Sequence, residues 1–139
     1  MNIIEVRNLL KSYPLPGNKK ETFNAVDGIT FNIKVSEIYG ILGPNGAGKT
    51  TTLEMLEGLN DIDGGSALIN GLDVSTNVFK VKEIIGVQLQ ANEYFDKLNL
   101  TELLILFGKL YSEEIDSDDL LKKVDLLGKS NAKPEELSG

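Results

Sequence analysis

A glycine-rich segment in the first half of the chain carries the residues best suited to chemistry. Residues 43–50 run Gly-Pro-Asn-Gly-Ala-Gly-Lys-Thr, which fits the phosphate-binding pattern G-x-x-x-x-G-K-S/T. The glycines let the backbone curl so that successive N–H groups face one concavity, where they can hold phosphate oxygens. Lys49 would place its charge on the β- and γ-phosphates, and the Thr50 hydroxyl would bind Mg²⁺. The predicted phosphate-binding residues are Gly43, Asn45, Gly46, Ala47, Gly48, Lys49, Thr50 and Thr51.

The elements next to this segment are the ones that a phosphate loop needs. Glu37–Leu42 is short and mostly apolar, which is typical of a strand buried on both faces of a parallel sheet. A helix should begin at Lys49 and end near Gly58, so that its positive N-terminal end faces the same phosphates. A chance match to the pattern has odds of roughly one in a hundred in this composition, before its position between strand and helix is counted.

Further strands and helices surround this unit. Asp27-Gly28 is a two-residue hairpin signal, which predicts one strand over Thr22–Val26 and another over Ile29–Lys34. Ala67–Ile69 and Glu83–Leu89 are predicted to be strands as well.

The last third of the chain has helical periodicity. Apolar residues at helical spacing predict a helix over 100–111, with Asn99 and Glu102 forming a capping box. A second helix is predicted from Ser117 to Gly128. The residues expected to face inward on that helix are Leu120, Leu121, Val124 and Leu127. We therefore expect an α/β unit followed by a small helical unit.

Composition excludes several classes of function. The chain has 139 residues, no cysteine and no histidine, so it contains no disulfide, no thiolate metal site and no Ser-His triad. Fourteen basic against twenty-one acidic residues give a net charge of −7, which disfavours nucleic acid as a partner. No apolar run approaches the ~18 residues typical of a membrane span, and no signal peptide is predicted.

Three further segments narrow the choice among kinases, GTPases and ATPases that the phosphate loop leaves open. They are Lys11-Ser12-Tyr13, the run Ile-Gly-Val-Gln-Leu-Gln at 85–90, and Leu137-Ser138-Gly139, which begins 87 positions beyond Thr50. With these segments, the whole chain resembles the first part of an ATP-binding-cassette (ABC) nucleotide-binding domain. The resemblance implies an α/β P-loop NTPase fold with N-terminal antiparallel strands, a P-loop strand and helix, and a small helical subdomain.

The resemblance also implies roles for individual residues. Tyr13 would stack on adenine, although a surface aromatic in a loop is the alternative. Gln90 would be the Q-loop glutamine, a catalytic residue together with Lys49 and a contact to Mg²⁺. The alternative for that role is Gln88, because Leu89 stands where the family often has proline. Ser138 and Gly139 would begin the L-S-G-G-Q signature and touch the γ-phosphate of ATP held by a second subunit.

The domain boundaries follow from the same resemblance. Residues 1–90 would form a β-subdomain with an incomplete P-loop core, and residues 91–139 would begin the helical signature subdomain. The family's strand ending in a magnesium-binding aspartate and a water-positioning glutamate has no counterpart in this sequence, nor has its switch histidine. We therefore expect a truncated piece of a longer protein, inactive in hydrolysis by itself and able to self-associate through exposed core surface.

The function implied for the parent is that of the ATP-hydrolysing subunit of an ABC membrane transporter. Its cofactors would be ATP and Mg²⁺. Its partners would be a second nucleotide-binding domain, as homodimer or heterodimer, and a transmembrane permease that holds it at the cytoplasmic face of the membrane. Residues 86–90 and 106–111 favour the ABC-2 drug and antibiotic exporter branch. The alternatives are a soluble ABC-type ATPase of translation or DNA repair, and a P-loop interaction module without hydrolysis.

Overall fold

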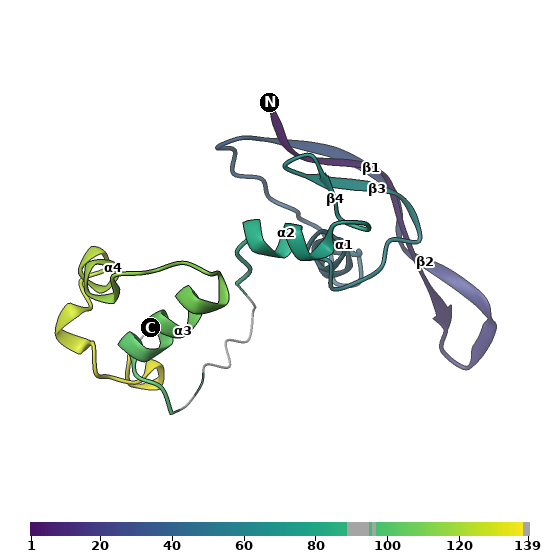
Figure 1. The fold of residues 1–139 in the computed structure, drawn as a ribbon. Coiled ribbons are helices and arrows are strands. Elements are labelled where there is room, and N and C mark those ends of the chain that lie inside the picture. The colour runs from purple at the N-terminus through teal and green to yellow at the C-terminus, as the bar shows by residue number, and fades with distance from the viewer. Residues whose placement is uncertain (89–94, 96, 138–139) are drawn as a thin grey trace. The chain divides into compact units, whose positions relative to one another are not determined.

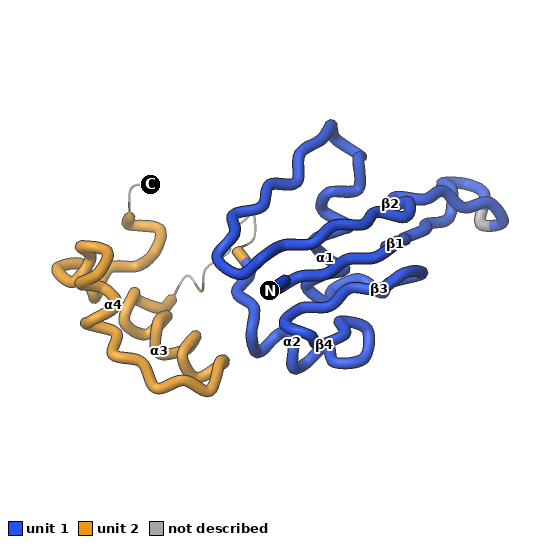
Figure 2. Tube along the Cα trace, turned by 90° about the horizontal axis from the view of Figure 1, so that it is seen from above, with its two compact units in different colours: residues 1–87 blue, residues 88–139 orange. Residues whose placement is uncertain are grey.

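The computed structural model describes residues 1–88, 95 and 97–137 (Figure 1). The chain divides into two compact units, Met1–Val87 and Gln88–Gly139 (Figure 2). No helix among the described residues is long and apolar enough to span a bilayer.

The first unit is built on a four-stranded antiparallel sheet with the order β2-β1-β3-β4. The strands are β1 (Asn2–Leu15), β2 (Asn18–Lys34), β3 (Gly64–Ile69) and β4 (Leu72–Asp73). The β3–β4 turn is Asn70-Gly71, where both residues have positive φ (49° and 76°), as a tight hairpin of this hand requires. The prediction of a strand over Ala67–Ile69 is confirmed.

The predicted hairpin at Asp27-Gly28 is wrong. β2 runs straight through these residues, and the chain reverses instead between Leu15 and Asn18. Leu9 pairs with Ile29 while its neighbour Leu10 pairs with Asp27, so Gly28 is an extra residue on β2 with a left-handed φ of 67°. The Asp-Gly signal therefore marks a β-bulge, which uses the same glycine conformation as a tight turn.

Two helices cover one face of this sheet, as Figures 1 and 2 show. They are α1 (Lys49–Leu56) and α2 (Val78–Ile84). Their buried side chains join those of the strands in one apolar cluster, which removes both from water. The cluster contains Val6, Leu9, Val26, Met55, Leu56, Ala67, Ile69, Val74 and Val81. The predicted helix after the phosphate loop is confirmed, and Gly58 follows its end with a φ of 66°.

The predicted strand over Glu37–Leu42 does not form. These residues are irregular, and Ile38 and Leu42 are 101% and 94% exposed. A strand is stabilised by pairing with a neighbour, and no described strand pairs with this segment. It is instead attached to the sheet through Tyr39, whose ring stacks on Phe31 of β2 with centroids 5.2 Å apart.

The predicted strand over Glu83–Leu89 is also wrong. α2 includes Glu83 and Ile84, residues 85–88 have no regular structure, and Leu89 lies outside the described residues. Val81 on α2 is fully buried, and Ile85, just beyond the helix with an extended backbone, packs against the same core. Residues 83–88 therefore form the end of α2 and an irregular stretch, and not a strand of the sheet.

The second unit contains α3 (Leu100–Leu110), α4 (Ser117–Lys123) and the short 3₁₀ turns η1 (Leu127–Lys129) and η2 (Pro134–Glu136). The α3 capping box is confirmed: Asn99 Oδ1 accepts from the Glu102 N–H at 2.9 Å, and Glu102 Oε2 accepts from the Asn99 N–H at 3.0 Å.

α4 begins at Ser117 as predicted, but it ends well before Gly128. Asp125 has a left-handed φ of 58°, and the Leu126 N–H bonds back to the Leu121 carbonyl oxygen at 2.8 Å, which closes the helix. Leu121 is buried as expected. The inward orientation predicted for Val124 and Leu127 is wrong, because both lie beyond the last helical turn and are 61% and 43% exposed.

Candidate nucleotide-binding site

The N-terminus of α1 has the features of an anion-binding end. The helix follows directly on the glycine-rich loop, and its cap is Gly48, which offers no side-chain hydrogen bond. The first intrahelical bond runs from the Thr52 N–H to the Gly48 carbonyl oxygen at 2.8 Å, so the amides of residues 49–51 have no helical acceptor. No acidic side chain lies in the first turn. This end of α1 therefore offers free amides and a positive dipole end to a phosphate.

Lys49 folds back over the loop that precedes it. Its Nζ donates to the carbonyl oxygens of Gly43 at 2.8 Å and Pro44 at 2.7 Å. The side chain is half-buried, whereas Thr50 beside it is exposed. The ammonium group is thus held at the loop, in the position from which a lysine of this pattern can contact phosphate.

The last loop glycine also has a packing role that the sequence did not reveal. A Cβ placed on Gly48 would lie 2.1 Å from the carbonyl oxygen of Ala25 and 3.1 Å from the Val26 side chain, both on β2. Gly46, in contrast, has open space around its Cα. Gly48 therefore lets the loop lie directly against the sheet.

The three consecutive threonines of α1 have different environments. Thr52 is buried, and its hydroxyl donates to the Gly48 carbonyl oxygen at 2.8 Å, which ties the helix to the loop. Thr51 is half-buried and Thr50 is exposed, so the hydroxyl predicted to bind Mg²⁺ faces solvent. The sequence pattern does not predict this role of Thr52, because the role depends on burial of the Thr52 side chain.

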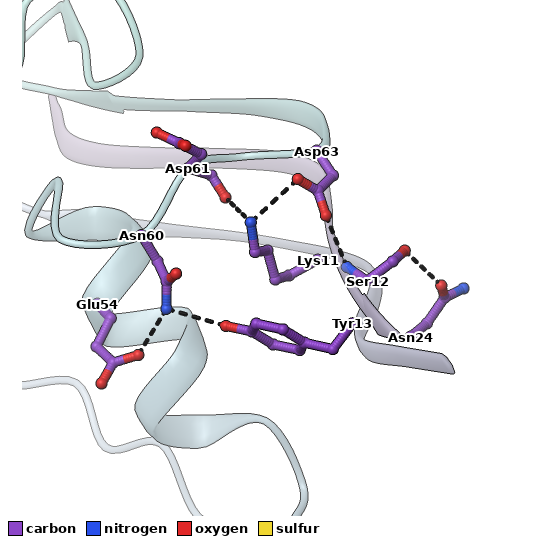
Figure 3. Close-up of polar contacts among 8 residues, drawn as sticks. All are labelled: Lys11, Ser12, Tyr13, Asn24, Glu54, Asn60, Asp61 and Asp63. Carbon is purple, nitrogen blue, oxygen red and sulfur yellow. Dashed lines mark hydrogen bonds and ion pairs between the residues drawn. The ribbon is translucent and has the colours of Figure 1, made fainter. Parts of the chain in front are cut away.

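Tyr13 lies on β1 and is half-buried, with its hydroxyl toward Asn60 (Figure 3). Its cross-strand partner is Phe23, whose ring centroid is 6.2 Å away, and Lys11 Nζ lies over the Tyr13 ring at 5.6 Å. The Tyr13 hydroxyl accepts a hydrogen bond from Asn60 Nδ2 at 3.0 Å. Tyr13 is therefore part of the sheet and not an aromatic in a loop.

The strand pairing places this ring on the same pair of strands as the loop. Gly48 seats against Ala25 and Val26, and Val26 is the partner of Lys11 on β1. Tyr13 is two residues further along that strand, which corresponds to about 7 Å. The loop thus contacts β2 two residues from Phe23, the cross-strand partner of Tyr13.

An ion pair connects β1 to the turn before β3. Lys11 is buried, and its Nζ donates to the Asp61 carbonyl oxygen at 2.8 Å and to Asp63 Oδ1 at 3.0 Å. The other carboxylate oxygen of Asp63 accepts the Ser12 N–H at 2.8 Å. The Ser12 hydrogen bond, followed by that from Lys11, lowers the pKa of Asp63 below its usual value. The Asp63 contacts could not be predicted from the sequence, because they join positions about fifty residues apart.

Three of the predicted site residues cannot be placed. Gln90, Ser138 and Gly139 lie outside the described residues. Gln88, the alternative to Gln90, is exposed and irregular. In the described part of the chain, no three acidic side chains gather into a metal-binding group.

Comparisons with known proteins show the family to which this chain is similar. The model of the family described as "ABC transporter" matches residues 26–139. The Nod factor export ATP-binding protein I of Burkholderia orbicola is 36% identical over 141 residues, covering 98% of this chain and 44% of that protein. The linearmycin resistance ATP-binding protein LnrL of Bacillus subtilis is 32% identical, covering 99% of this chain and 43% of that protein. The chain thus spans less than half the length of these two relatives.

Solved structures show the same fold. One described as the ATP-binding subunit of an ABC transporter superposes with a TM-score of 0.79 at 23% identity, covering 98% of this chain and 56% of that one. A dimeric ATP-binding cassette in a post-hydrolysis state, bound to ADP and Pi, gives a TM-score of 0.76 at 23% identity, covering 97% and 63%. The predicted α/β, ABC ATPase-like fold class is confirmed.

Proposed function

Because the chain belongs to the ABC transporter family, we propose that it is the nucleotide-binding part of an ATP-binding subunit whose ATP binding and hydrolysis drive transport across a membrane. The observation that supports this most directly is the loop and α1 arrangement. Free amides, a helix N-terminus without acidic residues and the Lys49 ammonium converge on the residues of the phosphate-binding pattern.

The residues present suit ATP with Mg²⁺. The loop amides and Lys49 would hold the phosphates, Thr50 would bind the metal, and Thr51 would donate to a phosphate nearer the ribose. Tyr13 would stack on the adenine, and Gln90, or alternatively Gln88, would contact the metal and the attacking water. When bound, Mg²⁺ neutralises the charge that develops on the transferred phosphoryl group.

The proposed partners complete the site. A second nucleotide-binding domain would receive Ser138 and Gly139 at its γ-phosphate, and a transmembrane permease would hold the subunit at the cytoplasmic face of the membrane. The names of the relatives from Burkholderia orbicola and Bacillus subtilis include export of Nod factor and resistance to linearmycin. Their similarity supports a place in the exporter branch.

Calorimetric titration of the chain with Mg-ATP, Mg-GTP and buffer tests the proposal. We expect saturable binding of ATP that weakens roughly 10- to 150-fold in Lys49→Ala, because hydrogen bonds to a charged group are lost. Lys109→Ala, an exposed lysine on α3, is the matched control and should bind as the wild type does. Absence of ATP binding by folded wild-type chain, or equal binding by Lys49→Ala, would contradict the proposal.

A further inference from the structure

Asn60 joins the aromatic ring to the phosphate-loop helix through two hydrogen bonds. It lies just after α1 and is half-buried. Its Nδ2 donates to the Tyr13 hydroxyl at 3.0 Å and to Glu54 Oε2 on α1 at 2.7 Å, as Figure 3 shows. The Asn60 N–H also donates to the Glu54 carbonyl oxygen at 3.1 Å, so backbone and side chain are both tied to α1.

The chemistry of the three groups fixes the direction of both bonds. An ionised carboxylate only accepts hydrogen bonds, so the Asn60 amide must turn its nitrogen, and not its oxygen, toward Glu54. The second hydrogen of the same nitrogen then points at Tyr13, whose hydroxyl oxygen must accept it. Glu54 thus orients Asn60, and Asn60 in turn fixes the tip of the Tyr13 ring.

These contacts connect Tyr13 to the helix that begins at the phosphate loop. α1 begins with Lys49 at the phosphate loop, and Glu54 lies on the same helix. Tyr13 is on β1, so without Asn60 its hydroxyl would lose this connection to α1. Stacking of a base on an aromatic ring depends on the plane of that ring, because the attraction requires contact between the two faces.

We propose that Asn60, oriented by Glu54, is a positioning residue that holds the Tyr13 ring in the plane that accepts the base of ATP. Lys11 Nζ lies over one face of the ring, and the base stacks on the opposite face. The inference rests on the proposed function, since it requires that the loop bind nucleotide and that Tyr13 receive the base.

Two ligands that differ only in the nucleoside part separate this role from a structural one. Mg-ATP carries the base, whereas Mg-tripolyphosphate engages the loop alone. In calorimetric titrations of the chain, we expect Asn60→Ala to weaken ATP binding roughly 2- to 12-fold, the range for one lost hydrogen bond, and to leave tripolyphosphate binding unchanged. Tyr13→Phe removes the acceptor and should give the same pattern.

The double variant Tyr13→Phe/Asn60→Ala should be no weaker than either single variant, because both remove the same bond. Asn32→Ala, an exposed asparagine on β2, is the matched control and should change neither affinity. Equal weakening of ATP and tripolyphosphate, or wild-type ATP affinity in Asn60→Ala, would overturn the positioning role while leaving the proposed function intact. Failure of wild-type chain to bind either ligand would overturn both.

Discussion

At the scale of single residues, positions 46 and 48 are both glycine, but for different reasons. Both have left-handed φ angles, 81° and 79°, which glycine adopts without strain. Only Gly48 is also pressed against the sheet, at the Ala25 carbonyl oxygen. The phosphate-binding pattern predicts both glycines but treats them alike, because contact with β2 is a property of the folded chain.

A pair of alanine substitutions distinguishes these two requirements. Gly46→Ala should destabilise the chain by about 1–2 kcal/mol, the cost of a left-handed alanine. Gly48→Ala adds steric overlap with the Ala25 carbonyl group and should cost roughly 2–5 kcal/mol. Urea unfolding monitored by circular dichroism measures both values. Equal destabilisation by the two variants would show that Gly48 is not held against β2 as the structure has it.

At the scale of elements, the correct helix predictions rest on local signals. α1 and α3 were predicted because their signals are local: a glycine loop before α1 and the Asn99–Glu102 box before α3. The segments at 37–42 and 83–89 were predicted wrongly because apolar runs do not say which neighbour they will meet. Asp27-Gly28 was misassigned because a bulge and a tight turn use the same glycine conformation.

The link between β1 and the turn before β3 makes stability depend on pH. The pKa of Asp63 is lowered by the Ser12 N–H and by Lys11. The stability that the Asp63 carboxylate contributes is therefore fully present above the pKa of an ordinary aspartate, and it is lost as the pH falls through the lowered pKa. Asp63→Asn should therefore be less stable than wild type at neutral pH. The difference should shrink between about pH 5 and pH 3.

Urea unfolding at a series of pH values measures this difference. Asp61→Asn is a matched control, because Lys11 contacts the main-chain oxygen of Asp61 and not its carboxylate. We expect this control to follow the wild-type pH profile. If the stability difference between wild type and Asp63→Asn stayed constant from pH 7 to pH 3, the pH dependence could not be assigned to the Asp63 carboxylate.

At the scale of the whole molecule, the phosphate-binding pattern is visible in the sequence, whereas the support of Tyr13 is not. The loop is one continuous segment, so its pattern is visible in the chain. Asn60 reaches Tyr13 only after β1 and α1 have packed together, and the sequence separation of 47 residues hides that contact. Sequence analysis thus detects most readily the sites whose residues lie in one continuous segment of the chain.

Segment 37–42 exposes apolar side chains through which two copies of the chain should associate. Ile38 and Leu42 are almost fully exposed, and burying them between two copies would remove their apolar surface from contact with water. Sedimentation velocity should show an average mass that rises with concentration. Ile38→Lys/Leu42→Lys should lower that mass toward the monomer value, whereas Leu110→Lys, at a 66% exposed position on α3, should not. A wild-type chain that stays monomeric at all concentrations would rule out association through segment 37–42, and a double variant that associates as strongly as wild type would assign the contact to another surface.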